Sequence, residues 1–166
     1  EALGRDVFRY FGMGCRSVTK LYLPVGFDLN RLFKIWIEWS HIANHNKYAN
    51  NYDYHKAVWL LNQVDLIENG FVLLKEDKAF LSPVGSLFYE SFSDMSSLIA
   101  HLEAHANDLQ CIAVRNPEDF RDSLVPLVPL GTTQMPMPWD YADGVDTISF
   151  LLGLSSSQKL KPSHVE

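Results

Sequence analysis

Hydrophobic and polar residues follow two rhythms along this chain. Apolar side chains at alternate positions or in short continuous runs predict strands at 17–23, 71–74, 86–92 and 110–114. Apolar side chains three and four residues apart predict helices at 5–11, 28–43, 54–63 and 93–106, a short helix starting at 116, and a helix or strand at 145–154. Strands separated by helices at this spacing indicate an α/β fold with a mostly parallel sheet.

Polar residues predict where several of these elements begin and end. Asp28, Asp53 and Asp94 precede helical patterns, where a carboxylate caps the first turn. The Asn- and Tyr-rich segment 45–53 favours an ordered loop, and the four prolines of 125–139 favour a surface loop without regular structure. We therefore expect one domain over 1–154 and a frayed tail over 155–166, whose composition offers little to bury.

Composition narrows the class of protein. A chain of 166 residues with 47% hydrophobic residues can bury one core, and 14 basic against 20 acidic residues give a net charge of -6 that disfavours binding to nucleic acid. No apolar run approaches the ~20 residues of a membrane span. The two cysteines, Cys15 and Cys111, are far apart, which fits free thiols in a reducing, cytoplasmic compartment. The start at Glu1 without Met favours a fragment of a longer protein.

The segment 11–24 (FGMGCRSVTKLYLP) contains the first candidate for chemistry. Gly12 and Gly14 permit positive φ or a close approach to a ligand, and a strand pattern follows Cys15. Arg16 beside Cys15 would favour the thiolate, so the residues admit a reactive thiol, although a cysteine in an ordinary turn fits them too. Cys111, inside the apolar run QCIAV, is typical of an inert buried cysteine.

Histidines and carboxylates offer weaker candidates. His41 and His45 have a spacing that could pair two imidazoles, with Asp53 or His55 completing a set, but the first lacks the neighbouring glutamate of zinc proteases and we expect no metal site. Asp94, Asp140, Asp143 and Asp146 could suggest paired carboxylates for acid–base chemistry, but helix capping and turns explain these four without chemistry.

Glu90 differs from the other carboxylates because it lies within the apolar strand pattern SLFYESF. There a charged side chain needs either solvent or a partner, and an outward-facing edge residue is the ordinary explanation. The only closely spaced glycines, Gly12 and Gly14, lack the third glycine and the strand-to-helix context of a dinucleotide fingerprint.

Four segments together resemble the C-terminal catalytic part of an acyl-CoA reductase of the LuxC type, a branch of the aldehyde dehydrogenase superfamily. Segment 11–24 is similar to the turn that presents the superfamily's nucleophilic cysteine, with Cys15 and Lys20 at the corresponding places. Segments 47–62 (KYANNYDYHKAVWLLN) and 140–151 (DYADGVDTISFL) resemble the reductase branch. Segment 89–92 (YESF) looks like the superfamily's Glu-x-Phe element, although Ser93-Asp94 replaces the usual Gly-Pro.

The resemblance implies a three-layer α/β/α, aldehyde dehydrogenase-like catalytic domain and an NADPH-dependent reduction of fatty acyl-CoA to fatty aldehyde. It implies that Cys15 forms an acyl thioester, that its backbone N–H supplies one oxyanion donor, and that Glu90 contacts the nicotinamide ribose. The cofactor domain, the general-base glutamate and the oxyanion asparagine of relatives would precede Glu1, so the fragment alone should be inactive. Acyl-CoA is the implied partner, and assembly into a homo-oligomer stays open.

A second hypothesis is non-enzymatic. A catalytically silent α/β domain of the same fold could serve in assembly, with the proline-rich segment and the aromatic residues Trp139 and Tyr141 as contacts. The reactivity of the Cys15 thiol separates the two hypotheses.

Overall fold

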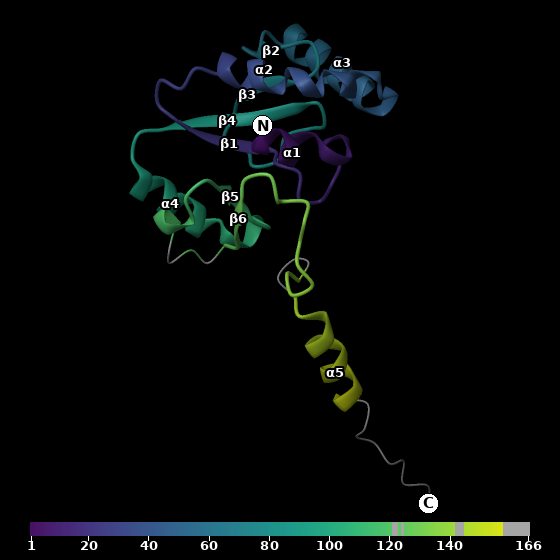
Figure 1. Cartoon of the computed structure of the whole chain (residues 1–166), viewed down its shortest axis with the longest axis vertical. Helices are drawn as coiled ribbons and strands as arrows, with labels where there is room; N and C mark the ends of the chain where they lie inside the picture. The colour runs from purple at the N-terminus through teal and green to yellow at the C-terminus, as the bar shows by residue number, and fades with distance from the viewer. Residues whose placement is uncertain (121–122, 124, 142–144, 158–166) are drawn as a thin grey trace, which may run out of the picture. The chain divides into compact units, whose positions relative to one another are not determined.

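The computed structural model describes residues 1–120, 123, 125–141 and 145–157. They divide into two compact units, 1–135 and 136–166, which are considered separately. Figure 1 traces the elements of the first unit in chain order. Its helices are α1 (Ala2–Phe8), α2 (Asn30–Trp36), α3 (Asn46–Leu61) and α4 (Met95–Ala104), and its 3₁₀ turns are η1 (Arg9–Gly12), η2 (Ile37–Asn44), η3 (Ala106–Asp108) and η4 (Pro117–Phe120).

Across the described ranges, six short strands form two sheets. Their bounds are β1 (Lys20–Pro24), β2 (Ile67–Glu68), β3 (Leu73–Glu76), β4 (Ser86–Phe92), β5 (Ile112–Val114) and β6 (Leu127–Pro129). The larger sheet has the order β1-β4-β3-β2, with β4 parallel to both neighbours and β2 antiparallel to β3, while β5 and β6 form a separate parallel pair. The prediction of an α/β fold with a mostly parallel sheet is confirmed.

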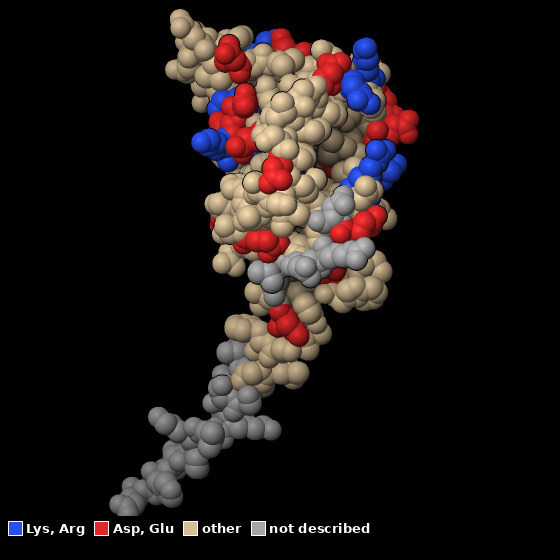
Figure 2. Space-filling view, turned by 90° about the vertical axis from the view of Figure 1, so that its left-hand side faces the viewer, with Lys and Arg blue, Asp and Glu red and all other residues tan. Residues whose placement is uncertain are grey.

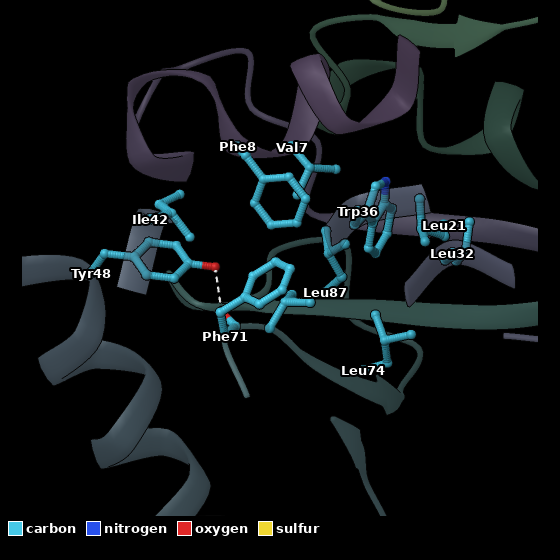
Figure 3. Close-up of a cluster of buried hydrophobic side chains, with 11 residues drawn as sticks. Val7, Phe8, Leu21, Leu32, Trp36, Ile42, Tyr48, Phe71, Leu74 and Leu87 are labelled. Atoms are coloured by element: carbon cyan, nitrogen blue, oxygen red, sulfur yellow. Dashed lines mark hydrogen bonds between the residues drawn. The ribbon is translucent and has the colours of Figure 1, made fainter. Parts of the chain in front are cut away.

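The main core lies between the larger sheet and the first helices. Figure 3 shows Phe8 from α1 and Trp36 from α2 directed toward the strand side chains, and the two rings meet edge to face with centroids 5.3 Å apart. Tyr48 of α3 is also buried, and its hydroxyl donates a 2.8 Å hydrogen bond to the Phe71 carbonyl. Burying these large rings supplies the main driving force for docking the helices on the sheet, because each removes much apolar surface from water.

A second cluster joins α4 to the smaller sheet. It consists of Leu98 and Leu102 of α4, Val114 of β5 and Phe120 of η4. In Figure 1 these elements form a group below the larger sheet, and the strand-to-helix connection from β4 to α4 links the two groups. The first unit therefore contains two neighbouring cores.

The prediction of a loop over 45–53 is wrong, whereas the helix predicted at 54–63 is found over 54–61. A single helix, α3, covers Asn46–Leu61, and its N-cap is His45, whose ring Nδ1 accepts a 3.3 Å hydrogen bond from Tyr48 N. Asp53 lies inside this helix. The misassignment followed from the polar composition of the segment, although Tyr48 and Tyr52 bury one face while the asparagines face outward or lie at its edges.

The strands also differ from expectation, with β1 at Lys20–Pro24 rather than 17–23 and β3 at Leu73–Glu76 rather than 71–74. Strand β5 is shorter than predicted and is half-buried rather than covered on both faces, and it pairs with β6 in the smaller sheet. Strand β6 lies in the proline-rich segment predicted to have no regular structure. Proline is tolerated there because Pro129 is at the end of the strand.

The second unit contains helix α5 (Thr147–Ser157), which settles the 145–154 segment as a helix. The Asp146 carboxylate accepts a 2.9 Å hydrogen bond from Ser149 N and so caps its first turn. The predicted tail starts at 155, but α5 continues to Ser157, and the rest of the tail, 158–166, lies outside the described residues.

Candidate functional site

Cys15 lies in a tight turn between η1 and β1 and is exposed. Ser17 N donates to the Gly14 carbonyl at 2.9 Å, and Gly14 N donates to Ser17 Oγ at 3.1 Å, so two hydrogen bonds enclose the cysteine. Among the described residues, the Cys15 backbone N–H makes no hydrogen bond. The turn therefore presents a thiol and a backbone donor together.

The approach to this turn has an unusual backbone. Tyr10, Phe11 and Gly12 all have left-handed conformations, with φ of 53°, 59° and 64°. Two of them carry aromatic side chains, for which this region is unfavourable. Phe11 stacks on the His45 ring with centroids 3.8 Å apart, which helps to hold the strained segment against the start of α3. The positive φ predicted as an option for Gly12 is confirmed.

Cys15 lines a cleft of about 960 Å³ in the first unit. The Cys15 turn and β1 form one side, and α4 with the residues around β5 form another. The lining is largely apolar and includes Leu98, Leu102, Ile112, Val114 and Phe120. A cleft of this size and character suits an extended apolar ligand.

Charged residues of the cleft are mainly basic. Within the described residues, Arg16, Lys20, Lys47 and Arg115 line it with one acidic residue, Asp108, and the charge of Lys20 is compensated by Glu90. The whole chain has a net charge of -6, so the cleft departs from the average charge of the protein. The face in Figure 2 carries acidic and basic side chains interspersed among uncharged ones. A locally positive cleft favours ligands with an anionic group.

Cys111, the second cysteine, lines the same cleft, where it is half-buried. It directly precedes β5 rather than lying in the middle of a buried strand. The fold thus brings the two cysteines, 96 positions apart in the sequence (111 minus 15), to one cavity.

Glu90 lies on β4, next to β1 in the parallel register that pairs it with Tyr22. Its Oε2 is 2.7 Å from Lys20 Nζ, and the Lys20 side chain is 6% exposed. Lys20 also donates to the Asp77 carbonyl. Lys20 is therefore the partner that the charged Glu90 needs within an apolar strand. Glu90 itself is not among the residues that line the cleft. The ribose contact expected of Glu90 stays a prediction.

Tyr22 follows Lys20 on the same face of β1. Its hydroxyl lies 3.2 Å from His101 Nε2 of α4, and Tyr22 lines the cleft. Burial, with a smaller contribution from the Glu90 carboxylate, raises the pKa of Tyr22 to about 12. The phenol consequently stays protonated at neutral pH and acts as a neutral hydrogen-bonding group.

Three residues near the turn were not singled out by the sequence. Gln134 Nε2 donates a 3.1 Å hydrogen bond to Ser17 Oγ, and the segment before Gln134 is bound by the buried Asp6 carboxylate. Asp6, 1% exposed, offered one signal, because a carboxylate between apolar helix positions needs donors. Gln134 and Ser17 offered none, since their proximity arises from contacts across more than a hundred residues.

The histidine candidates do not converge on a metal site. His45 caps α3, and His41 Nδ1 lies 3.1 Å from the Glu38 carbonyl. Over the part of the chain that the structure describes, no three His, Cys, Asp or Glu residues are arranged to hold a metal ion.

Asp94 is a helix cap as predicted, because it accepts a 2.7 Å hydrogen bond from Ser97 N at the start of α4. Asp140 instead accepts a 2.9 Å hydrogen bond from Met137 N, three residues before it, in a turn. The hydrogen bonds from Ser97 lower the pKa of Asp94. Asp143 lies outside the described residues.

No protein-family model, curated protein or solved structure matches this chain. The helices within the described ranges are too short or too polar to cross a membrane.

Proposed function

We propose that this chain is the cysteine-bearing catalytic part of an NADPH-dependent fatty acyl-CoA reductase, in which Cys15 accepts the acyl group from CoA. The proposal includes a three-layer, aldehyde dehydrogenase-like arrangement of the complete domain. The observation that carries it is the exposed Cys15 thiol at a large, mostly apolar cleft. Resemblance of segment 11–24 to a nucleophilic-cysteine turn supports the same assignment.

The cleft offers complementary surfaces to the two halves of an acyl-CoA. Apolar residues of α4, β5 and η4 would cover a fatty chain and remove it from water, at about 0.8 kcal/mol per buried methylene. Arg16, Lys47 and Arg115 would attract the phosphates of CoA. A ligand with a long apolar chain and an anionic end is the class that matches both features.

Acyl transfer to Cys15 is balanced without an external reagent. The thiolate sulfur attacks the thioester carbonyl carbon, the carbonyl electrons move to oxygen, and their return expels the CoA thiolate. One thioester replaces another, so the step is close to thermoneutral. The Cys15 N–H, which has no acceptor among the described residues, is available to donate to the transient oxyanion.

NADPH would supply the hydride that releases the aldehyde, and it enters the proposal through the resemblance. The described residues do not fit a nicotinamide site around Glu90, because that carboxylate is ion-paired with Lys20 and is not part of the cleft lining. The residues of this chain would therefore serve the acyl-transfer half of the reaction.

Intact-mass spectrometry after incubation with myristoyl-CoA tests the proposal. We expect one acyl adduct that hydroxylamine removes, retained in Cys111→Ser and lost in Cys15→Ser. The paired variants serve as matched controls, because both thiols line the same cleft. An adduct that survives in Cys15→Ser would refute the assignment of the nucleophile.

A non-catalytic role in assembly is the second candidate, favoured by the surface of the second unit. Trp139 is 67% exposed, and α5 exposes Ile148, Phe150 and Leu152. Exposed apolar side chains at this density are typical of interaction surfaces. The non-catalytic role is supported if Cys15 forms no acyl adduct and reacts with iodoacetamide no faster than a model thiol of pKa ~8.5.

A further inference from the structure

We propose that Gln134 is a positioning residue for the Cys15 turn: its side-chain amide packs on Gly14 and binds Ser17, and so holds the cysteine in place at the cleft. The catalytic meaning of this role rests on the proposed function, but the contact itself can be tested without it. Gln134 is far from Cys15 in sequence, and nothing in its own segment indicates the role.

The contact with Gly14 is the first observation. A Cβ atom added at Gly14 would lie 2.7 Å from both Gln134 Nε2 and Oε1 and 2.9 Å from Cδ, well inside van der Waals contact. Gly14 does not have the left-handed φ that would itself demand glycine. Of the two explanations that the sequence allowed for this glycine, close approach therefore applies, and the approaching group is the Gln134 amide.

Ser17 is the second contact point. Its Oγ accepts from Gly14 N and from Gln134 Nε2, both at 3.1 Å, and its backbone N–H donates to the Gly14 carbonyl at 2.9 Å. The Gln134 amide thus contacts the residue before Cys15 and hydrogen-bonds the second residue after it. The turn can open only if the hydrogen bond between Gln134 Nε2 and Ser17 Oγ breaks or if the Gln134 side chain moves with Ser17.

The segment that carries Gln134 is itself anchored. The Asp6 carboxylate of α1, 1% exposed, accepts from Gly131 N at 2.5 Å and from Thr133 N and Oγ1 at 3.0 Å. The Asp6 carbonyl also accepts from Val18 N at 3.1 Å, just past the turn. Asp6 therefore fixes both the segment before Gln134 and the start of the strand after Cys15.

This arrangement has a direct consequence for a nucleophile. A thiol and an oxyanion donor must keep their positions to within fractions of an ångström for acyl transfer, and supporting side chains supply that rigidity. Thr133, adjacent to Gln134, lines the same cleft as Cys15, so the anchored segment connects the turn to the cavity wall. Gln134 supports the turn from outside the cavity lining, as a positioning residue rather than a catalytic one.

Amide hydrogen exchange of this chain, measured by NMR, tests the contact. In Gln134→Ala we expect the Ser17 N–H to lose about tenfold or more of its protection, while the Val18 N–H, bound to Asp6, serves as an internal reference. Thr132→Ala is the matched control, because the Thr132 hydroxyl bonds the Pro129 carbonyl and should leave Ser17 protection as in the wild type.

A compensating substitution separates this contact from a general loss of stability. Gly14→Ala alone should reduce Ser17 protection, because its methyl group displaces the Gln134 amide, whereas Gly14→Ala combined with Gln134→Ala should be no worse than Gln134→Ala alone. Additive losses in the double variant, or unchanged Ser17 protection in Gln134→Ala, would overturn the proposal.

Acylation by myristoyl-CoA gives the functional readout. Gln134→Ala should slow the acylation of Cys15 at saturating acyl-CoA about tenfold while changing the half-saturating concentration little, because the glutamine does not line the cleft. Wild-type acylation kinetics despite a loosened turn would refute the positioning role. If the wild-type chain takes up no acyl group, the proposed function fails, and hydrogen exchange still decides whether Gln134 holds the turn.

Discussion

Removing the Asp6 carboxylate should destabilise the protein more than any change at a neighbouring exposed position. Asp6 is 1% exposed and accepts three hydrogen bonds, from the backbone N–H groups of Gly131 and Thr133 and from the Thr133 hydroxyl. In Asp6→Ala these three donors stay buried without an acceptor. At about 1–3 kcal/mol for each of the three unsatisfied groups, the expected loss is roughly 3–9 kcal/mol of unfolding free energy. The free energy of unfolding of a domain of this size is about 5–15 kcal/mol, so the variant should be close to unfolding.

Graded substitutions make the reasoning testable by urea unfolding. Asp6→Asn keeps one accepting oxygen and replaces the second with an NH₂ group, which faces a donor. About half of the loss of unfolding free energy in Asp6→Ala is therefore expected. Thr133→Val removes the hydroxyl bond alone, at about 1 kcal/mol, and Thr132→Val, whose hydroxyl is outside this cluster, should change stability by less than about 0.5 kcal/mol. The interpretation is wrong if Asp6→Ala shifts the midpoint no further than Thr132→Val.

Two further outcomes concern the first unit. Gly85→Ala should lower the free energy of unfolding, measured in urea, more than Gly26→Ala. Both glycines have positive φ (85° and 81°), but a Cβ at Gly85 would lie 2.9 Å from the Tyr52 backbone, whereas a Cβ at Gly26 meets nothing within 4 Å. Equal losses of stability in the two variants would contradict the close approach at Gly85. Hydrogen bonds from Lys56 and Tyr52 lower the pKa of Glu68 below its ordinary 4.5, so its stabilising contribution is present above pH 4.5 and is lost as pH falls through the lowered pKa. The melting-temperature difference between wild type and Glu68→Gln should therefore be largest near pH 7 and shrink below about pH 4, and a difference independent of pH would count against this ion pair.

Local patterns in the sequence were sufficient for much of the secondary structure. The bounds of β4 were predicted as they are found, and the Asp94 cap and the buried Leu98 and Leu102 of α4 follow from polar and apolar spacing alone. These features depend on residues close together in the chain, so periodicity and capping chemistry suffice. The first half of α3 was missed for the opposite reason, because its burial depends on tyrosines that meet Phe71 and Glu68 of other segments.

The sequence by itself determined the class of fold, the absence of a dinucleotide glycine fingerprint and the position of Cys15 in a turn before a strand. The tertiary structure decided what surrounds that turn. It placed Cys15 and Cys111 on one cleft, paired Glu90 with Lys20, and brought Gln134 onto Gly14. Each of these contacts joins residues 70 or more positions apart, as 90 minus 20 shows for the ion pair. Such distances are closed only when the cores form, because burial of apolar surface, and not any local preference, brings those segments together.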